Sequence, residues 1–152
     1  METPADFSVI LAKMKTYCNK AERCTQQVKL KLQRLSVPFH EQNEIIAALI
    51  SENFMNEARF ASAYANDHFQ FRKWSKLKIK MHLRQLQISD RNIQDALSDL
   101  PHDADEALIK SLIPALQRKY QSKGAAQWKY VANALVRKGF STDLVFRLVK
   151  EE

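Results

Sequence analysis

The amino-acid sequence predicts an all-α protein, and three observations lead to that prediction. The 152 residues include only two glycines, although the tight turns of β-hairpins require residues with positive φ. Residues with high helix propensity, such as alanine, leucine, lysine and glutamine, are abundant. No stretch alternates polar and apolar residues over the length of a convincing strand.

Capping residues, prolines and apolar spacing divide the chain into nine predicted helices. We expect them over residues 5–20, 24–35, 39–53, 56–70, 75–87, 90–99, 103–122, 125–138 and 142–150. Ser89 and Ser141 are placed as N-caps, and Gly139 lies where a helix C-terminus favours a left-handed residue. Pro114 lies inside a helical pattern, so we expect a kink or a break there. Three further prolines precede helices, where proline is tolerated: Pro4, Pro38 and Pro101.

An apolar pattern recurs three times with a period of about 51 residues, which is typical of a helical repeat protein. Each copy has an apolar i, i+4 pair, a short turn with one apolar residue, and a second apolar pair. The copies begin at Val28, Ile79 and Val131. The pattern predicts two helices whose apolar faces meet at a corner filled by Val37, Ile88 or Phe140. With a preceding helix, each copy becomes a three-helix unit, over residues 1–54, 55–101 and 102–152.

The formal net charge is +7, and the basic residues are concentrated in three blocks, at 13–34, 72–91 and 110–138. Such a balance favours a protein with an acidic partner, with nucleic acid as the first candidate and an acidic protein as the second. The alternative is a basic protein that has no polyanion target. Lys76, Lys80 and Arg84 share one helix face by spacing. We predict a basic track for polyanion contact, as opposed to a merely solvated face, made of Arg72, Lys73, Lys76, Lys80, Arg84, Lys119, Lys123 and Lys129. Four aromatic residues among these charges are interpreted as core, with stacking on a base or a protein contact as the alternative: Trp74, Tyr120, Trp128 and Tyr130.

Several classes of function are not expected. Two glycines leave no phosphate-binding or dinucleotide loop, and the four histidines show no metal-ligand spacing. We therefore expect no catalysis, cofactor, metal or small-molecule substrate. Cys18 and Cys24 form no disulfide framework and fit a reducing cytoplasm. The first six residues lack a signal core, and the longest apolar run, 45–50, is too short to span a bilayer.

Four segments together resemble the RecX family. Residues 54–61, FMNEARFA, resemble its aromatic-Leu-Asp-Asp-x-Arg-Phe-Ala signature, and residues 73–79, KWSKLKI, resemble the segment that follows. Residues 83–88, LRQLQI, and 135–141, LVRKGFS, resemble its Leu-x-x-Lys-Gly-Ile and Leu-x-x-x-Gly-Phe-Ser segments. Two family glycine positions hold Ser75 and Gln87, and the matching turn of the first repeat has Ser36. We expect a cost of about 1 kcal/mol wherever such a residue has positive φ.

The resemblance implies a cytoplasmic regulator that binds the RecA–DNA filament and modulates the recombinase, with inhibition as the expected effect, in DNA repair and the SOS response. It also implies an elongated, curved molecule whose repeats lie along the filament groove. Weak direct DNA binding through phosphates is compatible with this function.

Two alternatives remain open at this point. One is a helix-turn-helix protein that reads DNA directly without a RecA partner. The helix after each turn is poor in base-reading side chains, which disfavours this alternative. Residues 90–99 offer Arg91, Asn92 and Gln94 beside Asp90, Asp95 and Asp99, and residues 142–150 offer only Arg147 and Lys150. The other alternative is a helical scaffold for an unrelated acidic protein.

Overall fold

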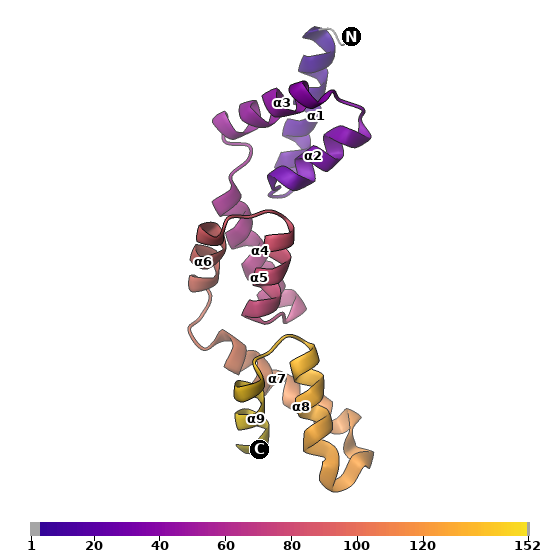
Figure 1. Ribbon diagram of the computed structural model, residues 1–152, viewed down its shortest axis with the longest axis vertical. Coiled ribbons are helices and arrows are strands. Elements are labelled where there is room, and N and C mark those ends of the chain that lie inside the picture. The colour runs from indigo at the N-terminus through magenta and orange to yellow at the C-terminus, as the bar shows by residue number, and fades with distance from the viewer. Residues whose placement is uncertain (1–3, 152) are drawn as a thin grey trace. The chain divides into compact units, whose positions relative to one another are not determined.

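The computed structural model describes residues 4–151, and within that range the protein consists of nine α-helices and one 3-10 helix, with no strand (Figure 1). The prediction of an all-α protein is therefore confirmed. The helices are α1 (Pro4–Lys20), α2 (Thr25–Arg34), α3 (Phe39–Ser51), α4 (Glu57–Arg72), α5 (Lys76–Gln85), α6 (Asp90–Ser98), α7 (Ala104–Lys119), η1 (Gln121–Ala126), α8 (Gln127–Arg137) and α9 (Thr142–Glu151).

The connection between α7 and α8 differs from the prediction in two ways. The 3-10 helix η1 was not expected, and Gly124 interrupts it with a φ of 60°. Of the kink or break predicted at Pro114, the break is wrong, because α7 continues through this residue, and the kink stays a prediction. Proline removes the N–H that would bond to the carbonyl of Lys110. Both residues are exposed, so water can satisfy that carbonyl and the helix persists.

The same hydrogen-bonded turn ends α2, α5 and α8. After α5, the N–H of Ile88 donates to the Leu83 carbonyl at 3.1 Å, and the N–H of Gln87 donates to the Arg84 carbonyl at 3.0 Å. Gln87 has a φ of 64°, which completes a Schellman motif. The equivalent left-handed residues after α2 and α8 are Ser36, with a φ of 59°, and Gly139, with a φ of 101°.

The interior of these turns agrees with the repeat pattern. The three apolar turn residues Val37, Ile88 and Phe140 are at most 5% exposed, and so confirm the predicted corner. Ser89 and Ser141 cap α6 and α9, with their hydroxyls accepting from the N–H groups of Asn92 and Leu144.

At the family glycine position of Ser75 the expected strain does not arise, because the left-handed residue of this loop is Lys73, with a φ of 59°. Ser75 is instead a fully buried residue at the start of α5. Its hydroxyl accepts from the Lys78 N–H at 3.1 Å and donates to the Gly139 carbonyl at 2.8 Å.

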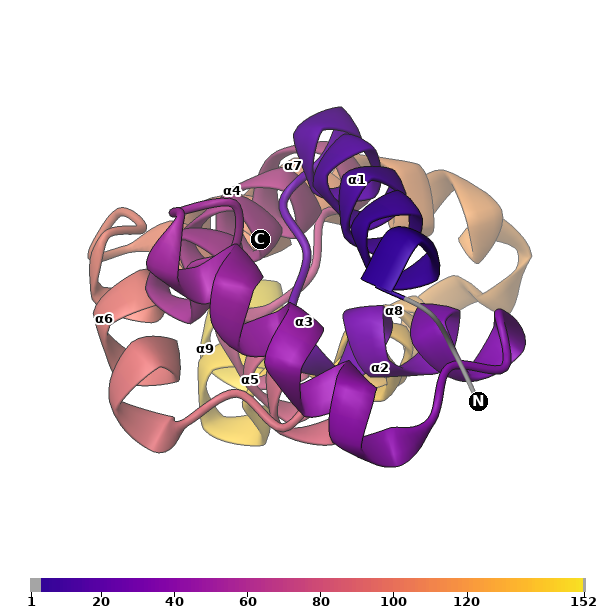
Figure 2. The same cartoon turned by 90° about the horizontal axis from the view of Figure 1, so that it is seen from above.

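The chain forms two compact units, which are described separately. The first comprises the chain up to Ala63 together with Leu83–Asp95, and the second comprises Tyr64–His82 together with the chain from Ala96. In the first unit, α3 packs against both α1 and α2 (Figures 1 and 2), around a core that includes Met14, Leu32 and Leu49. In the second, α7, α8 and α9 enclose a core that includes Ile109, Leu135 and Val145. The predicted repeat boundaries after residues 54 and 101 stay a prediction.

In each unit, an acidic residue from the first turn of one helix caps another helix. Glu57 of α4 accepts a hydrogen bond from the Thr25 N–H at the start of α2, at 3.3 Å. Asp105 of α7 accepts one from the Lys76 N–H at the start of α5, at 2.9 Å. These N–H groups have no acceptor within their own helix, so each carboxylate satisfies a donor and complements the positive end of the helix dipole.

Candidate polyanion-binding surface

The basic residues of α5 have acidic neighbours. Lys76 is half-buried and lines a cavity of about 270 Å³ with Asp103, Asp105 and Glu106. Arg84 is exposed, and its Nε donates to the Asp90 carboxylate at 3.2 Å. Exposed ion pairs of this kind are worth only about 0–1 kcal/mol, so the guanidinium can exchange Asp90 for a phosphate at little cost. Lys80, one turn from Lys76, is half-buried.

Arg72 and Lys73 lie where α4 ends, and both side chains are exposed. The turn they form brings Trp74 into an aromatic cluster, with its ring 4.5 Å from that of His68 and 4.4 Å from that of His82. The Lys78 ammonium lies 4.5 Å from the Trp74 ring. The indole is thus half-buried among neighbours that occupy its surface, in keeping with the interpretation as a packing residue.

Lys119 and Lys123 lie beside a pair of tyrosines next to η1. The Lys119 ammonium is 5.4 Å from the Tyr120 ring, and that of Lys123 is 4.7 Å from the Tyr130 ring. The two rings are 5.5 Å apart and tilted by 33°. Lys129, further along the chain, lies 5.8 Å from the ring of Trp128.

The segment that carries Lys119, Lys123 and Lys129 favours an anion, because it has no acidic residue from 107 to 142. By their positions on the helices, the eight predicted site residues fall into three local groups: the end of α4, helix α5, and the η1–α8 region with the end of α7. Of these, the η1–α8 group has the fewest acids near it in the sequence.

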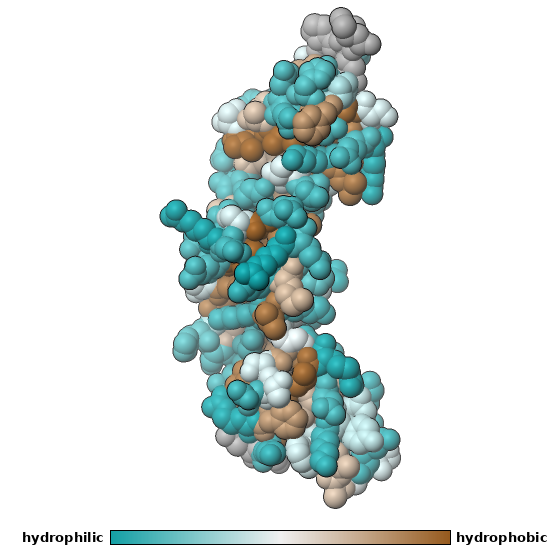
Figure 3. Space-filling view, in the orientation of Figure 1, coloured by the Kyte–Doolittle hydropathy of each residue, from teal (hydrophilic) through white to brown (hydrophobic). Residues whose placement is uncertain are grey.

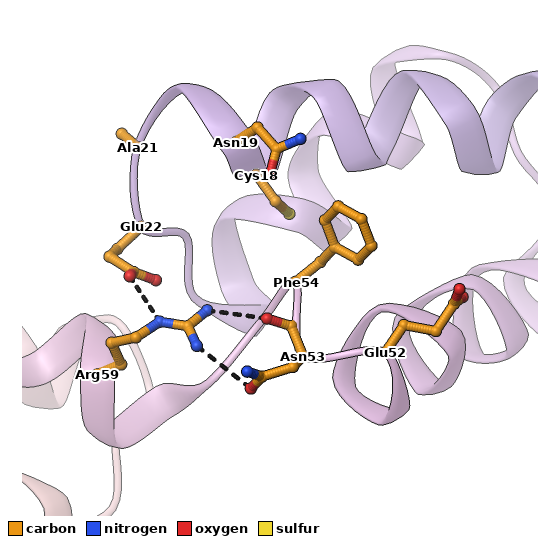
Figure 4. Close-up of a pocket in the computed structure, with 8 residues that line it drawn as sticks. All are labelled: Cys18, Asn19, Ala21, Glu22, Glu52, Asn53, Phe54 and Arg59. Atoms are coloured by element: carbon orange, nitrogen blue, oxygen red, sulfur yellow. Dashed lines mark hydrogen bonds and ion pairs between the residues drawn. The ribbon is translucent and has the colours of Figure 1, made fainter.

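Sequence reasoning assigned no role to Arg59, although the residue stands in the quoted motif. It borders a cavity of about 480 Å³ in the first unit (Figure 4). Its Nε donates to Glu22 at 2.6 Å, and its two terminal nitrogens donate to the side chain and the backbone carbonyl of Asn53, each at 3.2 Å. Asn53 has a φ of 65° and forms the turn that ends α3. Arg59 thus joins that turn to the loop after α1, which is a structural task.

Another cavity of the first unit is lined by basic residues and was not among the predicted sites. Lys13, Lys20 and Lys31 border a cavity of about 390 Å³ together with Tyr17. The guanidinium of Arg23 stacks on the Tyr17 ring at 3.9 Å, and the Lys31 ammonium lies 5.6 Å from that ring. Arg23 and Lys31 therefore occupy the surface of the Tyr17 ring on which a base would stack.

The structure offers no centre for metal chemistry among the residues it describes, since nowhere do three or more potential ligands of the His, Cys, Asp or Glu type come together. Cys18 and Cys24 are free and buried, and burial raises the pKa of both thiols. Across residues 4–151, no helix is both long and apolar enough to cross a membrane. Figure 3 shows a face that is mostly hydrophilic with small apolar patches.

Comparison with known proteins shows that the chain is similar to members of one family. Residues 56–97 match the family model of the second three-helix domain of RecX. The regulatory protein RecX of Leuconostoc mesenteroides is 28% identical over 120 residues, which cover 78% of this chain and 45% of that protein. The RecX of Limosilactobacillus reuteri is 25% identical over 142 residues, which cover 93% of this chain and 53% of that protein. The chain is similar to RecX proteins along most of its length, and to the second three-helix domain of that family over residues 56–97.

Solved RecX structures share the fold of this chain. A crystal structure of a regulatory protein RecX matches with a TM-score of 0.86 and 24% identity, covering 96% of this chain and 73% of the other. The structure of RecX from Lactobacillus salivarius matches with a TM-score of 0.85 and 23% identity, covering 98% and 97%. The chain spans about half the length of the curated relatives it matches.

Proposed function

We infer that the protein is a regulator of a RecA-type recombinase, which it restrains by binding the recombinase filament on DNA. Similarity to relatives that are named regulatory protein RecX carries this proposal. The net charge of +7 supports it, since a nucleoprotein filament is a polyanion. The basic residues of the predicted track at the end of α4 and on α5 are the proposed contacts, and of these Arg72, Lys73 and Arg84 are exposed.

Three targets distinguish this function from its alternatives. Binding is measured to bare duplex DNA, to the recombinase alone and to the recombinase–DNA filament. We expect the filament to bind most tightly and its DNA-dependent ATPase to slow as the protein is added. Equal affinity for bare duplex and filament would favour the direct DNA-binding function, and an ATPase indifferent to saturating protein would contradict the proposal.

A triple substitution tests the basic track on α5. Lys76→Ala, Lys80→Ala and Arg84→Ala should weaken filament binding while preserving the fold, because none of these side chains is part of the buried core. For every side chain that meets a phosphate, its removal should also flatten the log–log salt dependence of binding by roughly one unit.

The control for this variant removes the same charge from the first unit, through Lys20→Ala, Lys29→Ala and Arg34→Ala. If net charge alone matters, the two triple variants will bind equally. If the position of the charge matters, only the α5 variant will lose binding. An α5 variant that binds like the parent protein would refute the assignment of the track.

A further inference from the structure

A repeat-specific feature lies between α7 and α8. Short connections join α1 to α2 and α4 to α5, whereas the 3-10 helix η1, Gln121–Ala126, occupies the equivalent position between α7 and α8. Gly124 has a φ of 60°, and nothing lies within 4 Å of where its Cβ would be. Figure 1 shows η1 at the end of α8 that is remote from the α8–α9 turn. Insertions in single repeats often form binding surfaces, since the repeat fold does not require them.

The side chains around η1 combine exposed aromatic surface with positive charge. We call Lys119, Tyr120, Lys123 and Tyr130 the tyrosine–lysine patch. The Tyr130 side chain is 42% exposed, although a ring of its size favours burial. Lys123 and Lys119 hold their ammonium groups 4.7 Å and 5.4 Å from the two rings. The lysine stems are flexible, so both groups can move from the rings to a nearby anion.

Two observations favour nucleic acid over protein as the partner of the patch. Beyond residue 100, Tyr130 is the only large hydrophobic side chain that is exposed in the described structure. The patch combines one exposed ring with two lysines, whereas a protein interface of stable type has a centre depleted of charged residues. The second observation is the absence of any acidic residue from 107 to 142, which leaves the lysines with no neighbouring carboxylate in that segment.

We propose that the tyrosine–lysine patch binds single-stranded nucleic acid, with an unpaired base stacked on Tyr130 and the flanking phosphates contacted by Lys119 and Lys123. Single-strand binding proteins combine these two elements, because every base has a face that can stack on an aromatic ring. A duplex offers phosphates but keeps its bases stacked on one another. The patch therefore distinguishes unpaired from paired strands without reading sequence, and it does so without any recombinase.

The experiment measures binding of the full chain to three fluorescently labelled strands by anisotropy, in the absence of recombinase. The strands are an oligothymidylate, an abasic oligonucleotide with the same number of phosphates, and a duplex of the same length. We expect the oligothymidylate to bind about tenfold more tightly than the abasic strand, which is the effect of one base–aromatic stack. Equal binding of the abasic strand or of the duplex would overturn the proposal.

Substitutions locate the effect. Tyr130→Ala should remove the preference for oligothymidylate over the abasic strand, whereas Tyr130→Phe should keep it. Lys123→Ala should weaken binding of both single strands by a similar factor, because it removes a phosphate contact. Phe71→Ala is the matched control, since Phe71 is an aromatic side chain that is 77% exposed outside the patch, and it should change nothing.

Circular dichroism of each variant verifies that the fold is intact. A folded Tyr130→Ala variant that keeps the preference would refute the stacking site. Because the recombinase is absent, this result would leave the proposed regulation of the filament unaffected. Conversely, a failure of filament binding would not remove a stacking preference on free strands.

Discussion

Gly139 and Gln87 occupy the same place in two Schellman turns, and substitutions there should have opposite effects on stability. Gly139→Ala adds a Cβ that would lie 2.9 Å from the Ser75 hydroxyl oxygen, at a backbone φ of 101°. The left-handed conformation costs a non-glycine residue about 1–2 kcal/mol. Displacing the buried Ser75 hydroxyl from its bonds to the Gly139 carbonyl and the Lys78 N–H costs about 1–3 kcal/mol. Together these terms destabilise the fold by about 2–5 kcal/mol.

The reverse substitution, Gln87→Gly, relieves the left-handed strain of the existing side chain. Glycine loses more backbone entropy on folding, which offsets about 0.5–1 kcal/mol of the gain. A net stabilisation of about 0.5–1 kcal/mol is therefore expected, and Ser36→Gly should behave in the same way because its φ is 59°.

Urea denaturation, followed by circular dichroism, measures all three variants. A double-mutant cycle with Ser75→Ala and Gly139→Ala measures the coupling energy between the two positions. Because removal of the hydroxyl removes the clash, the double variant should lose less free energy of unfolding than the two single variants lose in sum. A Gly139→Ala variant that loses less than about 0.5 kcal/mol would show that the close approach to Ser75 is not rigid. Additive effects of the two substitutions would refute the proposed clash.

Three further predictions concern the core, the hydrogen bonds of Arg59 and the buried thiols. Leu83→Ala should cost about 2–5 kcal/mol, because the side chain is fully buried, and a loss below about 0.5 kcal/mol in denaturation would contradict the repeat pattern. Arg59→Lys should cost about 1–3 kcal/mol by the same measurement, since one ammonium cannot replace the bonds of the guanidinium to both Glu22 and Asn53. An unchanged free energy of unfolding would show that these bonds are dispensable. Burial raises the pKa of both thiols in the folded protein. The buried neutral thiols therefore contribute fully to the free energy of unfolding below the unfolded thiol pKa of about 8.5, and this contribution is lost as pH rises through the higher pKa values of the folded protein. A pH series of unfolding free energies should show this alkaline loss, and Cys24→Ala should reduce it. The leucine prediction extends to the equivalent residues Leu32 and Leu135.

Local sequence determined most of what could be predicted about the fold. The apolar pairs of the repeat, such as Ile79 with Leu83, specify which helix faces are buried, and both residues are indeed fully buried. Ser89 and Ser141 act as caps within three residues of their partners, so their role is visible in the sequence.

Features that depend on distant residues could not be predicted in this way. The buried Ser75 bonds to a carbonyl 64 residues away, and no local pattern indicates that contact. Arg59 likewise reaches back 37 residues to Glu22. Pro114 leaves α7 unbroken because that side of the helix is exposed, which depends on packing and not on the proline itself.

The candidate surface shows the same division. The sequence reveals where positive charge is concentrated, but not which charges are already engaged. Arg84 is paired with Asp90 six residues ahead, and Lys76 lies near Asp103 and Asp105. The exposure of Tyr130 was not expected from a sequence interpretation that favoured core aromatics.

The carboxylate caps on α2 and α5 have a consequence for hydrogen exchange. The amide hydrogen of Thr25 is held by Glu57 of α4, and that of Lys76 by Asp105 of α7. First-turn amides of a helix normally exchange quickly, because they have no acceptor within the helix. These two amides should exchange slowly, and only when α4 or α7 separates from the helix that it caps. Each therefore reports, at a single backbone position, how often neighbouring helices of the chain come apart.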